Sequence, residues 1–391
     1  MIDETLYQSG TKPSTIFQLF EYGLKQAAVV GRENVYDYSL GNPSVPAPQQ
    51  VTDAFQRLLG QEDPVSLHGY TPAAGALDVR QSIAADLSAR SGMDIRPQNL
   101  FLTCGAAPAL LYVLRALAVA QAEVIAITPY FPEYRVYAEA CGMRFVPTQA
   151  DLDQFQINLT SLEDCITPHT QAVIVNSPNN PSGAVYSRET LQKLAEVLAR
   201  KSREIGRPIY IIADEPYREL VYDGADVPFI PGIYPDTVVC YSYSKSLSLP
   251  GERLGYFCVP DGAADSPRLY TAACAAARMM GHVCAPALQQ RVISACTGIR
   301  PQLEVYDRNR RTLYDALTSY GYRCVYPSGA FYLFVEAPGG SARAFSDRAK
   351  EHNLLVVPGD DFGCPAFFRL STCVDSDMVE RSLPVFQRLA E

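Results

Sequence analysis

The sequence lacks a run of basic residues, an apolar stretch long enough to cross a bilayer, and cysteines spaced as metal ligands. Its net charge of −9 at pH 7 disfavours binding to nucleic acid or to an anionic membrane. The N-terminus, Met1-Ile2-Asp3-Glu4, has neither the basic nor the apolar region of a signal peptide. An odd number of cysteines, eleven, without an export signal is typical of a reducing cytoplasm. We therefore expect a cytoplasmic protein that binds no nucleic acid, membrane or metal.

The sequence also lacks internal repeats, low-complexity segments and long linkers, and its 391 residues suit two unequal domains. Hydrophobic residues make up 48% of the chain, enough for a substantial core. Apolar segments alternate with amphipathic ones such as 188–203, where Leu191, Leu194 and Leu198 share one face. This alternation predicts an α/β fold. The expected strands are 99–104, 123–127, 171–176, 208–214, 236–242 and 253–259.

A lysine, Lys245, follows the apolar, β-branched segment 237–241 and lies among small hydroxyl residues. At a strand exit its amine is partly desolvated, which favours the neutral form that attacks an aldehyde. Arg253 supplies a neighbouring cation and a planar fork for a phosphate, and Ser242 and Ser244 add hydroxyl donors. The alternative is a lysine on a solvated loop. Lys245 is thus a candidate Schiff-base lysine beside a phosphate site.

A carboxylate, Asp214, ends the apolar strand 208–214 and precedes Tyr217. A buried carboxylate requires a cationic partner, and a protonated pyridine nitrogen is one that would let the ring accept electrons. The Tyr217 hydroxyl would then reach the ring's phenolic oxygen. Asn180, in a turn dense in proline, asparagine and glycine, is a second donor to that oxygen. The alternatives are a helix cap at Asp214 and an ordinary turn at Asn180.

A strand-to-helix turn contains Gly105, Ala106 and Ala107. Gly105 permits a close approach of the backbone, and the N–H groups of both alanines can cradle a phosphate. Further along, Phe131 follows another predicted strand. Its ring could stack on a pyridine or could simply belong to the core. Each of these signals is weak alone, and together they describe one cofactor site.

From about Tyr38 to the C-terminus the chain resembles fold-type I enzymes that depend on pyridoxal 5′-phosphate (PLP), of the class I/II, aspartate aminotransferase-like family. The matching motifs are the Asn-Pro-Ser-Gly turn at Asn180, the group from Asp214 to Tyr217, and Ser-x-Ser-Lys with Pro-Gly-x-Arg-x-Gly. The resemblance implies an internal aldimine at Lys245, with Asp214 on the pyridine nitrogen and Asn180 and Tyr217 on the phenolic oxygen. It assigns Phe131 to ring stacking. It assigns the phosphate to the Gly105 turn with Ala106 and Ala107, and to Ser242, Ser244 and Arg253.

The resemblance extends to the substrate and to a partner. Arg369, embedded in the apolar segment 366–371, implies a bidentate pair with the substrate α-carboxylate, with Gly41 and Asn180 beside it. The alternative for Arg369 is an internal salt bridge with Asp360 or Asp361. Tyr70 resembles the family tyrosine that reaches the phosphate of the neighbouring subunit, which implies a homodimer with shared sites.

The family arrangement implies a large domain at 46–287 with a mixed, mostly parallel sheet flanked by helices. A smaller α+β domain would combine 1–45 and 288–391. Expected elements of the smaller domain and its surroundings are helices at 301–319 and 341–351, strands at 322–326, 330–335 and 367–372, and a helical lid or dimer arm at 16–28.

The implied reaction is a two-stage transamination from an L-amino acid to a 2-oxo acid, with Lys245 as the general base at Cα. Three alternatives stay open. A carbon–sulfur β-lyase uses the same cofactor site. A PLP-binding transcription regulator is opposed by the acidic charge and by a family match that begins at Tyr38. A non-catalytic binding protein is opposed by the joint presence of Lys245, Asp214 and Arg369.

The substrate side chain is left open by the sequence. An acidic side chain would need a second cation, for which Arg278 and His282 are candidates by position. Tyr130, Phe131 and Tyr332 could instead form an aromatic pocket. Cys104 and Cys284 are expected to pack near the cofactor without a role. Glutamate with 2-oxoglutarate is the default expectation for the co-substrate pair.

Overall fold

The fold is built on a seven-stranded sheet in a computed structural model that describes residues 2, 4–11 and 14–390. The strand order is β2-β8-β7-β6-β5-β3-β4, and β8 runs antiparallel to both neighbours while all other pairs are parallel. The predicted mixed, mostly parallel α/β sheet is confirmed. The strands are β2 (Leu100–Thr103), β3 (Glu123–Ala126), β4 (Arg144–Pro147), β5 (Thr170–Asn176), β6 (Tyr210–Asp214), β7 (Thr237–Ser242) and β8 (Gly255–Cys258).

The central strands are buried on both faces, which explains why they are apolar without a polar alternation. In β6, Ile211 and Ala213 face one core, and Tyr210 and Ile212 face the other. Asp214 lies on the same face of β6 as Tyr210 and Ile212, so its carboxylate points to the face of the sheet that α6 and α7 cover. The unpredicted strand β4 lies at the sheet edge, where its exposed end residues hide the hydrophobic signal.

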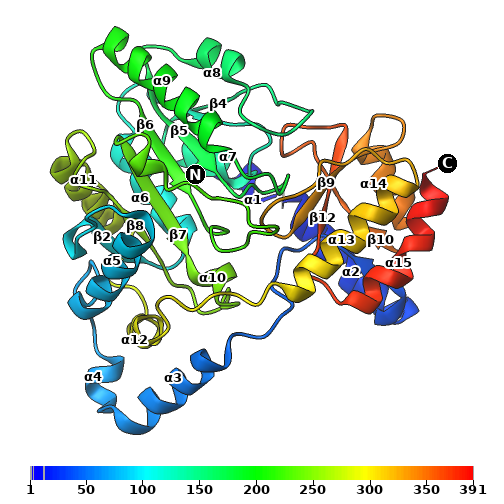
Figure 1. Ribbon diagram of the computed structural model, residues 1–391, viewed down its shortest axis with the longest axis horizontal. Coiled ribbons are helices and arrows are strands. Elements are labelled where there is room, and N and C mark those ends of the chain that lie inside the picture. Colours follow the sequence, from blue (N-terminus) through cyan, green and yellow to red (C-terminus); the bar gives the residue numbers. More distant parts are fainter. Residues whose placement is uncertain (1, 3, 12–13, 391) are drawn as a thin grey trace.

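Helices cover both faces of this sheet (Figure 1). The predicted helix at 188–203 is confirmed as α9, which is capped by the Ser187 side chain and ends at Gly206 in the left-handed conformation. The helices of this part of the chain are α3 (Gln49–Gln61), α4 (Pro64–His68), α5 (Leu77–Ser91), α6 (Ala106–Leu117), α7 (Glu133–Ala140), α8 (Leu159–Cys165), α9 (Arg188–Ile205), α10 (Tyr243–Ser246), α11 (Ser266–Met279) and α12 (Ala287–Ala295), with 3-10 turns at Pro97–Asn99 and Ile230–Gly232. Of these, α3 and α4 lie apart from the sheet, beside α12 (Figure 1). Within the described ranges no helix is both long and apolar enough to cross a membrane.

The two ends of the chain meet in a second unit, drawn to the right of the large sheet in Figure 1. Its antiparallel sheet has the order β11-β12-β9, and β1 pairs in parallel with β10. Its elements are α2 (Thr15–Val30), a 3-10 turn (Arg32–Asn34), β1 (Tyr36–Asp37), α13 (Glu304–Ser319), β9 (Tyr332–Glu336), α14 (Ala342–Lys350), β10 (Leu354–Leu355), β11 (Val357–Pro358), β12 (Phe367–Ser371) and α15 (Ser376–Leu389); α1 (Glu4–Gly10) precedes them.

Most predictions for this second unit are confirmed, with one error. The expected helices correspond to α13 and α14, the expected helical segment to α2, and two expected strands to β9 and β12. The expected strand at 322–326 is wrong, because the segment makes only an isolated bridge between Cys324 and Val335. Gly321 with a positive φ and Pro327 confine it to a connection between turns.

Candidate active site

A pocket of about 520 Å³ lies where β5, β6 and β7 end, between the large sheet and the second unit. In open α/β sheets the carboxyl ends of the strands are where ligands bind. Most of the residues predicted from the sequence line this one pocket. They are Gly41, Ala106, Ala107, Phe131, Asn180, Asp214, Tyr217, Ser242, Ser244, Lys245, Arg253 and Arg369.

Lys245 lies in α10, the short helix that follows β7, and its side chain is largely withdrawn from solvent. Its Nζ donates a hydrogen bond to the Gly41 carbonyl oxygen at 2.7 Å. Burial lowers the pKa of this amine to about 8, and the nearby Arg369 and Arg253 guanidinium groups act in the same direction. Within the described residues no carboxylate pairs with it. The lysine is therefore neutral far more often near pH 7 than a solvated loop lysine, as a nucleophilic amine requires.

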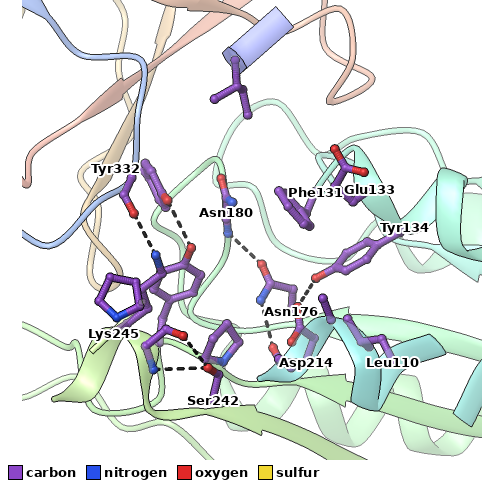
Figure 2. A pocket seen from close by; sticks show the side chains of 18 of the residues that line it. Leu110, Phe131, Glu133, Tyr134, Asn176, Asn180, Asp214, Ser242, Lys245 and Tyr332 are labelled. Atoms are coloured by element: carbon purple, nitrogen blue, oxygen red, sulfur yellow. Dashed lines mark hydrogen bonds between the residues drawn. The ribbon is translucent and has the colours of Figure 1, made fainter. Parts of the chain in front are cut away.

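Asp214 is 5% exposed and lies beside Tyr134 of α7 (Figure 2). Its Oδ2 accepts a hydrogen bond from the Tyr134 hydroxyl, whereas its Oδ1 is buried without a partner. Burial raises the pKa of this carboxyl to about 7, although the Tyr134 hydrogen bond opposes the rise. The next helical turn along the described chain is Ile230–Gly232, so the helix-cap alternative does not hold. The unpaired oxygen is suited to a buried cationic donor.

The turn between β2 and α6 faces the Arg253 side chain. Arg253 donates to the Cys104 carbonyl, the Pro250 carbonyl and, at 3.4 Å, the Ser244 hydroxyl. Gly105 has φ of 98°, and a Cβ there would lie 2.6 Å from Arg253 Nη2. The Ser242 and Ser244 hydroxyls are 2.7 Å apart. The two hydroxyls, the first N–H groups of α6 and Arg253, which has no carboxylate partner among the described residues, together form a site suited to an anion such as a phosphate.

Arg369 is 2% exposed, yet its side chain pairs with no acidic group within the described chain. Its two Nη atoms donate to the Asn180 side-chain oxygen at 3.0 Å and to the Ser39 carbonyl at 2.6 Å, and its Nε has no partner. The alternative of an internal salt bridge fails, because Asp360 pairs with Arg343 and Asp361 accepts from a threonine hydroxyl. A buried guanidinium without a counterion indicates a site for an anionic ligand.

Tyr217 and Phe131 complete the walls of the pocket. The Tyr217 hydroxyl lies 3.1 Å from the Tyr332 hydroxyl, and the Arg369 guanidinium lies over the Tyr332 ring at 4.6 Å. The Phe131 ring lines the pocket and packs nearly perpendicular to the Tyr134 ring, with 5.6 Å between the ring centroids. A Cβ at Gly41 would overlap the Tyr332 hydroxyl, so a larger residue here would displace the Tyr332 side chain.

Several candidates lie outside this chain's pocket. Gly105 supports the anion site without lining it, and Tyr70 is 90% exposed. Arg278 is exposed at the end of α11, and the His282 ring contacts the Ala73 carbonyl. Tyr130 packs against Phe145 in the core, and Cys104 and Cys284 do not reach the pocket through their side chains. The described residues contain no group of acidic, histidine or cysteine side chains that could hold a metal.

Tyr134, Asn176 and Glu133 are among the pocket residues that were not predicted from the sequence. Tyr134 binds Asp214, and Asn176 donates to the Asp214 carbonyl and accepts from the Asn180 N–H. Asn176 ends β5 directly beside Asp214 in the sheet register, so a polar residue at a neighbouring strand end was the available signal. Glu133, the first residue of α7, lines the pocket near Phe131 (Figure 2). Nothing in its local sequence marks it.

These groups fit PLP. The unpaired Oδ1 of Asp214 suits its ring nitrogen, the arginine and hydroxyl cluster suits its phosphate, and the neutral amine of Lys245 suits its aldehyde. The buried, unpaired Arg369 suits the carboxylate of an amino acid. Fold and site together define a PLP-dependent enzyme of amino acid chemistry.

Comparison with known proteins identifies the family. The chain belongs to the family described as aminotransferase class I and II, which matches residues 33–385. It is similar to an aminotransferase of known crystal structure from Eubacterium rectale, with 52% identity over 100% of this chain and 98% of that chain and a TM-score of 0.97. It is 26% identical to the aspartate aminotransferase of Thermus thermophilus with maleate, over 97% of both chains, with a TM-score of 0.85.

A third relative is the aromatic-amino-acid aminotransferase 2 of Thermococcus litoralis, 27% identical over 96% of this chain and 95% of that protein. The family confirms the predicted cofactor, PLP, and the predicted reaction class, transfer of an amino group from an amino acid to a 2-oxo acid. A carbon–sulfur lyase is not favoured. The two relatives with named substrates differ in the side chain they accept, so the family alone leaves the substrate of this chain open.

Proposed function

We propose that this aminotransferase uses Lys245 as both the covalent anchor of PLP and the base of the reaction. When bound, PLP supplies an aldehyde that takes up the amino group and a ring that accepts electrons. With PLP and an amino acid bound, the Lys245 amine would accept the proton from the substrate Cα. Its lowered pKa suits both tasks, since the amine must be neutral to attack and basic enough to take a proton.

The surrounding residues bind and orient in this proposal. Asp214 holds a proton on the ring nitrogen, Asn180 and Tyr217 bind the phenolic oxygen, and Phe131 packs on the ring. The phosphate-binding set is Ala106, Ala107, Ser242, Ser244 and Arg253, with Gly105 allowing their approach.

Substrate binding depends on Arg369, with Gly41 and Asn180 beside it. The observation that supports the proposal best is the pair of buried orphan atoms, Asp214 Oδ1 and Arg369 Nε, in side chains that line one pocket. Each requires a ligand group of opposite character, and PLP with an amino acid supplies both.

Absorption spectroscopy of the PLP-loaded protein tests these roles. We expect a yellow band that single amino acids remove and a 2-oxo acid restores. Lys245→Ala should still bind PLP noncovalently but lose turnover, and full activity of that variant would contradict the role of Lys245. A protein that stays yellow while releasing ammonia and pyruvate would indicate a lyase instead.

The assembly and organisation of the chain are also proposed. We infer a cytoplasmic homodimer in which Tyr70, 90% exposed here, reaches the phosphate of the neighbouring subunit. We also infer a large domain at 46–287 and a smaller domain from 1–45 and 288–391. This boundary assigns residues 288–295 of α12 to the smaller domain, although Val292 and Ile293 of that helix pack in the core of the large sheet. Analytical sedimentation measures whether the protein is a dimer. We expect Tyr70→Phe to weaken the retention of PLP while the protein remains a dimer.

A further inference from the structure

One charged side chain of the pocket has no role in the proposed function. Glu133 lies at the start of α7 beside Phe131, half-buried, and lines the same pocket as Lys245 (Figure 2). Within the described residues it makes no hydrogen bond or ion pair, and burial raises the pKa of its carboxyl. An unpaired carboxylate that faces a ligand site repels any second negative charge placed there.

The cations of the pocket are all committed elsewhere. The lining contains three of them, Lys245, Arg253 and Arg369. The proposed function assigns these to the PLP aldehyde, the PLP phosphate and the substrate α-carboxylate. Within one chain, no cation among the described lining residues remains for a second carboxylate, so a dicarboxylic substrate would need a cation from the partner subunit of the proposed homodimer.

Part of the remaining pocket lining is apolar. Ile16 and Phe17, at the start of α2, and Leu40, beside Gly41, line the pocket together with Phe131. Helix α2 is held there by its buried Leu19 and by the hydrogen bond from Thr15 to Asp361. A neutral, apolar side chain gains by covering this surface, whereas a carboxylate or an ammonium group would lose hydration against it.

We propose that Glu133 excludes dicarboxylic substrates, so that the amino donor and the 2-oxo acid acceptor both carry a neutral, apolar or aromatic side chain. The proposal rests on the proposed function, because it requires the α-carboxylate to be bound by Arg369. The pocket would discriminate between substrates in two ways, because Glu133 repels a second carboxylate and the apolar lining favours a neutral side chain. The expected acceptor is then a monocarboxylic 2-oxo acid in place of 2-oxoglutarate.

Binding of two inhibitors to the PLP-loaded enzyme tests the proposal. Maleate carries two carboxylates, and 3-phenylpropionate carries one carboxylate and an apolar ring. Spectral titration of the cofactor band gives both dissociation constants. We expect the wild type to prefer 3-phenylpropionate, and Glu133→Gln to shift the ratio of the two constants toward maleate by at least about tenfold. The matched control is Glu139→Gln, an exposed position on the same helix, which should leave the ratio unchanged.

Kinetics of the first half-reaction extend the test to substrates. We expect kcat/KM for phenylalanine or leucine to exceed that for aspartate in the wild type. In Glu133→Gln we expect the ratio of these kcat/KM values to become smaller. The proposal is overturned by an unchanged maleate ratio in that variant, by a wild type that prefers aspartate, or by lysine as the best donor. Arg369→Ala distinguishes a failure of the proposed function from a failure of the Glu133 proposal. If both inhibitors bind this variant as tightly as the wild type, the proposed function is wrong, independently of the result for Glu133.

Discussion

The buried carboxyl of Asp214 allows a quantitative prediction about the protein without PLP. Burial raises its pKa from 3.8 to about 7, a difference of roughly three pH units. Each unit corresponds to about 1.4 kcal/mol, so the ionised carboxylate destabilises the cofactor-free fold by roughly 4 kcal/mol. Because the folded-state pKa is the higher one, this penalty is absent below pH 4 and complete above pH 7.

Asp214→Asn removes the charge and keeps an oxygen for the Tyr134 hydroxyl to donate to. In the cofactor-free protein we expect this variant to raise the free energy of unfolding by up to about 4 kcal/mol at pH 8. The gain should fall toward zero between pH 7 and pH 4. With PLP bound the sign reverses, because a neutral amide no longer stabilises a protonated ring nitrogen, and PLP affinity falls.

Urea unfolding followed by far-ultraviolet circular dichroism provides the measurement, since the sequence contains no tryptophan to serve as a fluorescent probe. The control is Asp315→Asn, at an exposed position of α13. The reasoning is refuted if the difference between Asp214→Asn and the wild type is independent of pH, or if the variant is the less stable protein at pH 8 without PLP.

Two further predictions concern substrate binding and the cofactor's phenolic oxygen. Arg369→Ala should weaken amino acid binding at least about 30-fold, or roughly 2 kcal/mol, with a much smaller effect on PLP; an unchanged apparent substrate affinity would exclude the assigned role. Tyr332→Phe removes the hydroxyl 3.1 Å from that of Tyr217. If the Tyr332 hydroxyl donates to the Tyr217 oxygen, the Tyr217 proton stays available to donate to the phenolic oxygen of PLP. Without Tyr332 that donation weakens, so we expect the pH at which the visible band of the holoenzyme changes to rise in the variant. A pH titration of the visible band checks this, and an unmoved transition counts against it.

Groups at the ends of buried strands were predictable from the sequence. An apolar run that stops at a charged or polar residue, as at Asp214, marks the edge of a parallel sheet where such groups collect. Lys245 and Arg369 carried a similar signal, since each is a cation set into or directly behind an apolar strand. Asp214 and Lys245 come together because β6 and β7 are neighbours in the large sheet, whereas Arg369 lies on β12 of the smaller sheet and reaches the pocket only because the second unit packs against the first.

Groups presented by helices were not predictable in the same way. Tyr134 contacts Asp214 from 80 positions away, and only the packing of α7 against the sheet brings the two together. Glu133 precedes it on the same helix, where an acidic residue in the first turn is ordinary. The short strands β10 and β11 were missed because two-residue pairings depend on partners far along the chain.

The hydrogen bond from Lys245 Nζ to the Gly41 carbonyl oxygen joins two segments that are far apart in the sequence. It ties the N-terminal segment to the end of β7 through the one nitrogen that PLP must take. An amine engaged with the cofactor aldehyde would be drawn away from this carbonyl, and the contact that holds Gly41 would be weakened. Cofactor binding and this backbone contact therefore compete for one nitrogen, which links the N-terminal segment to the loading of the buried site.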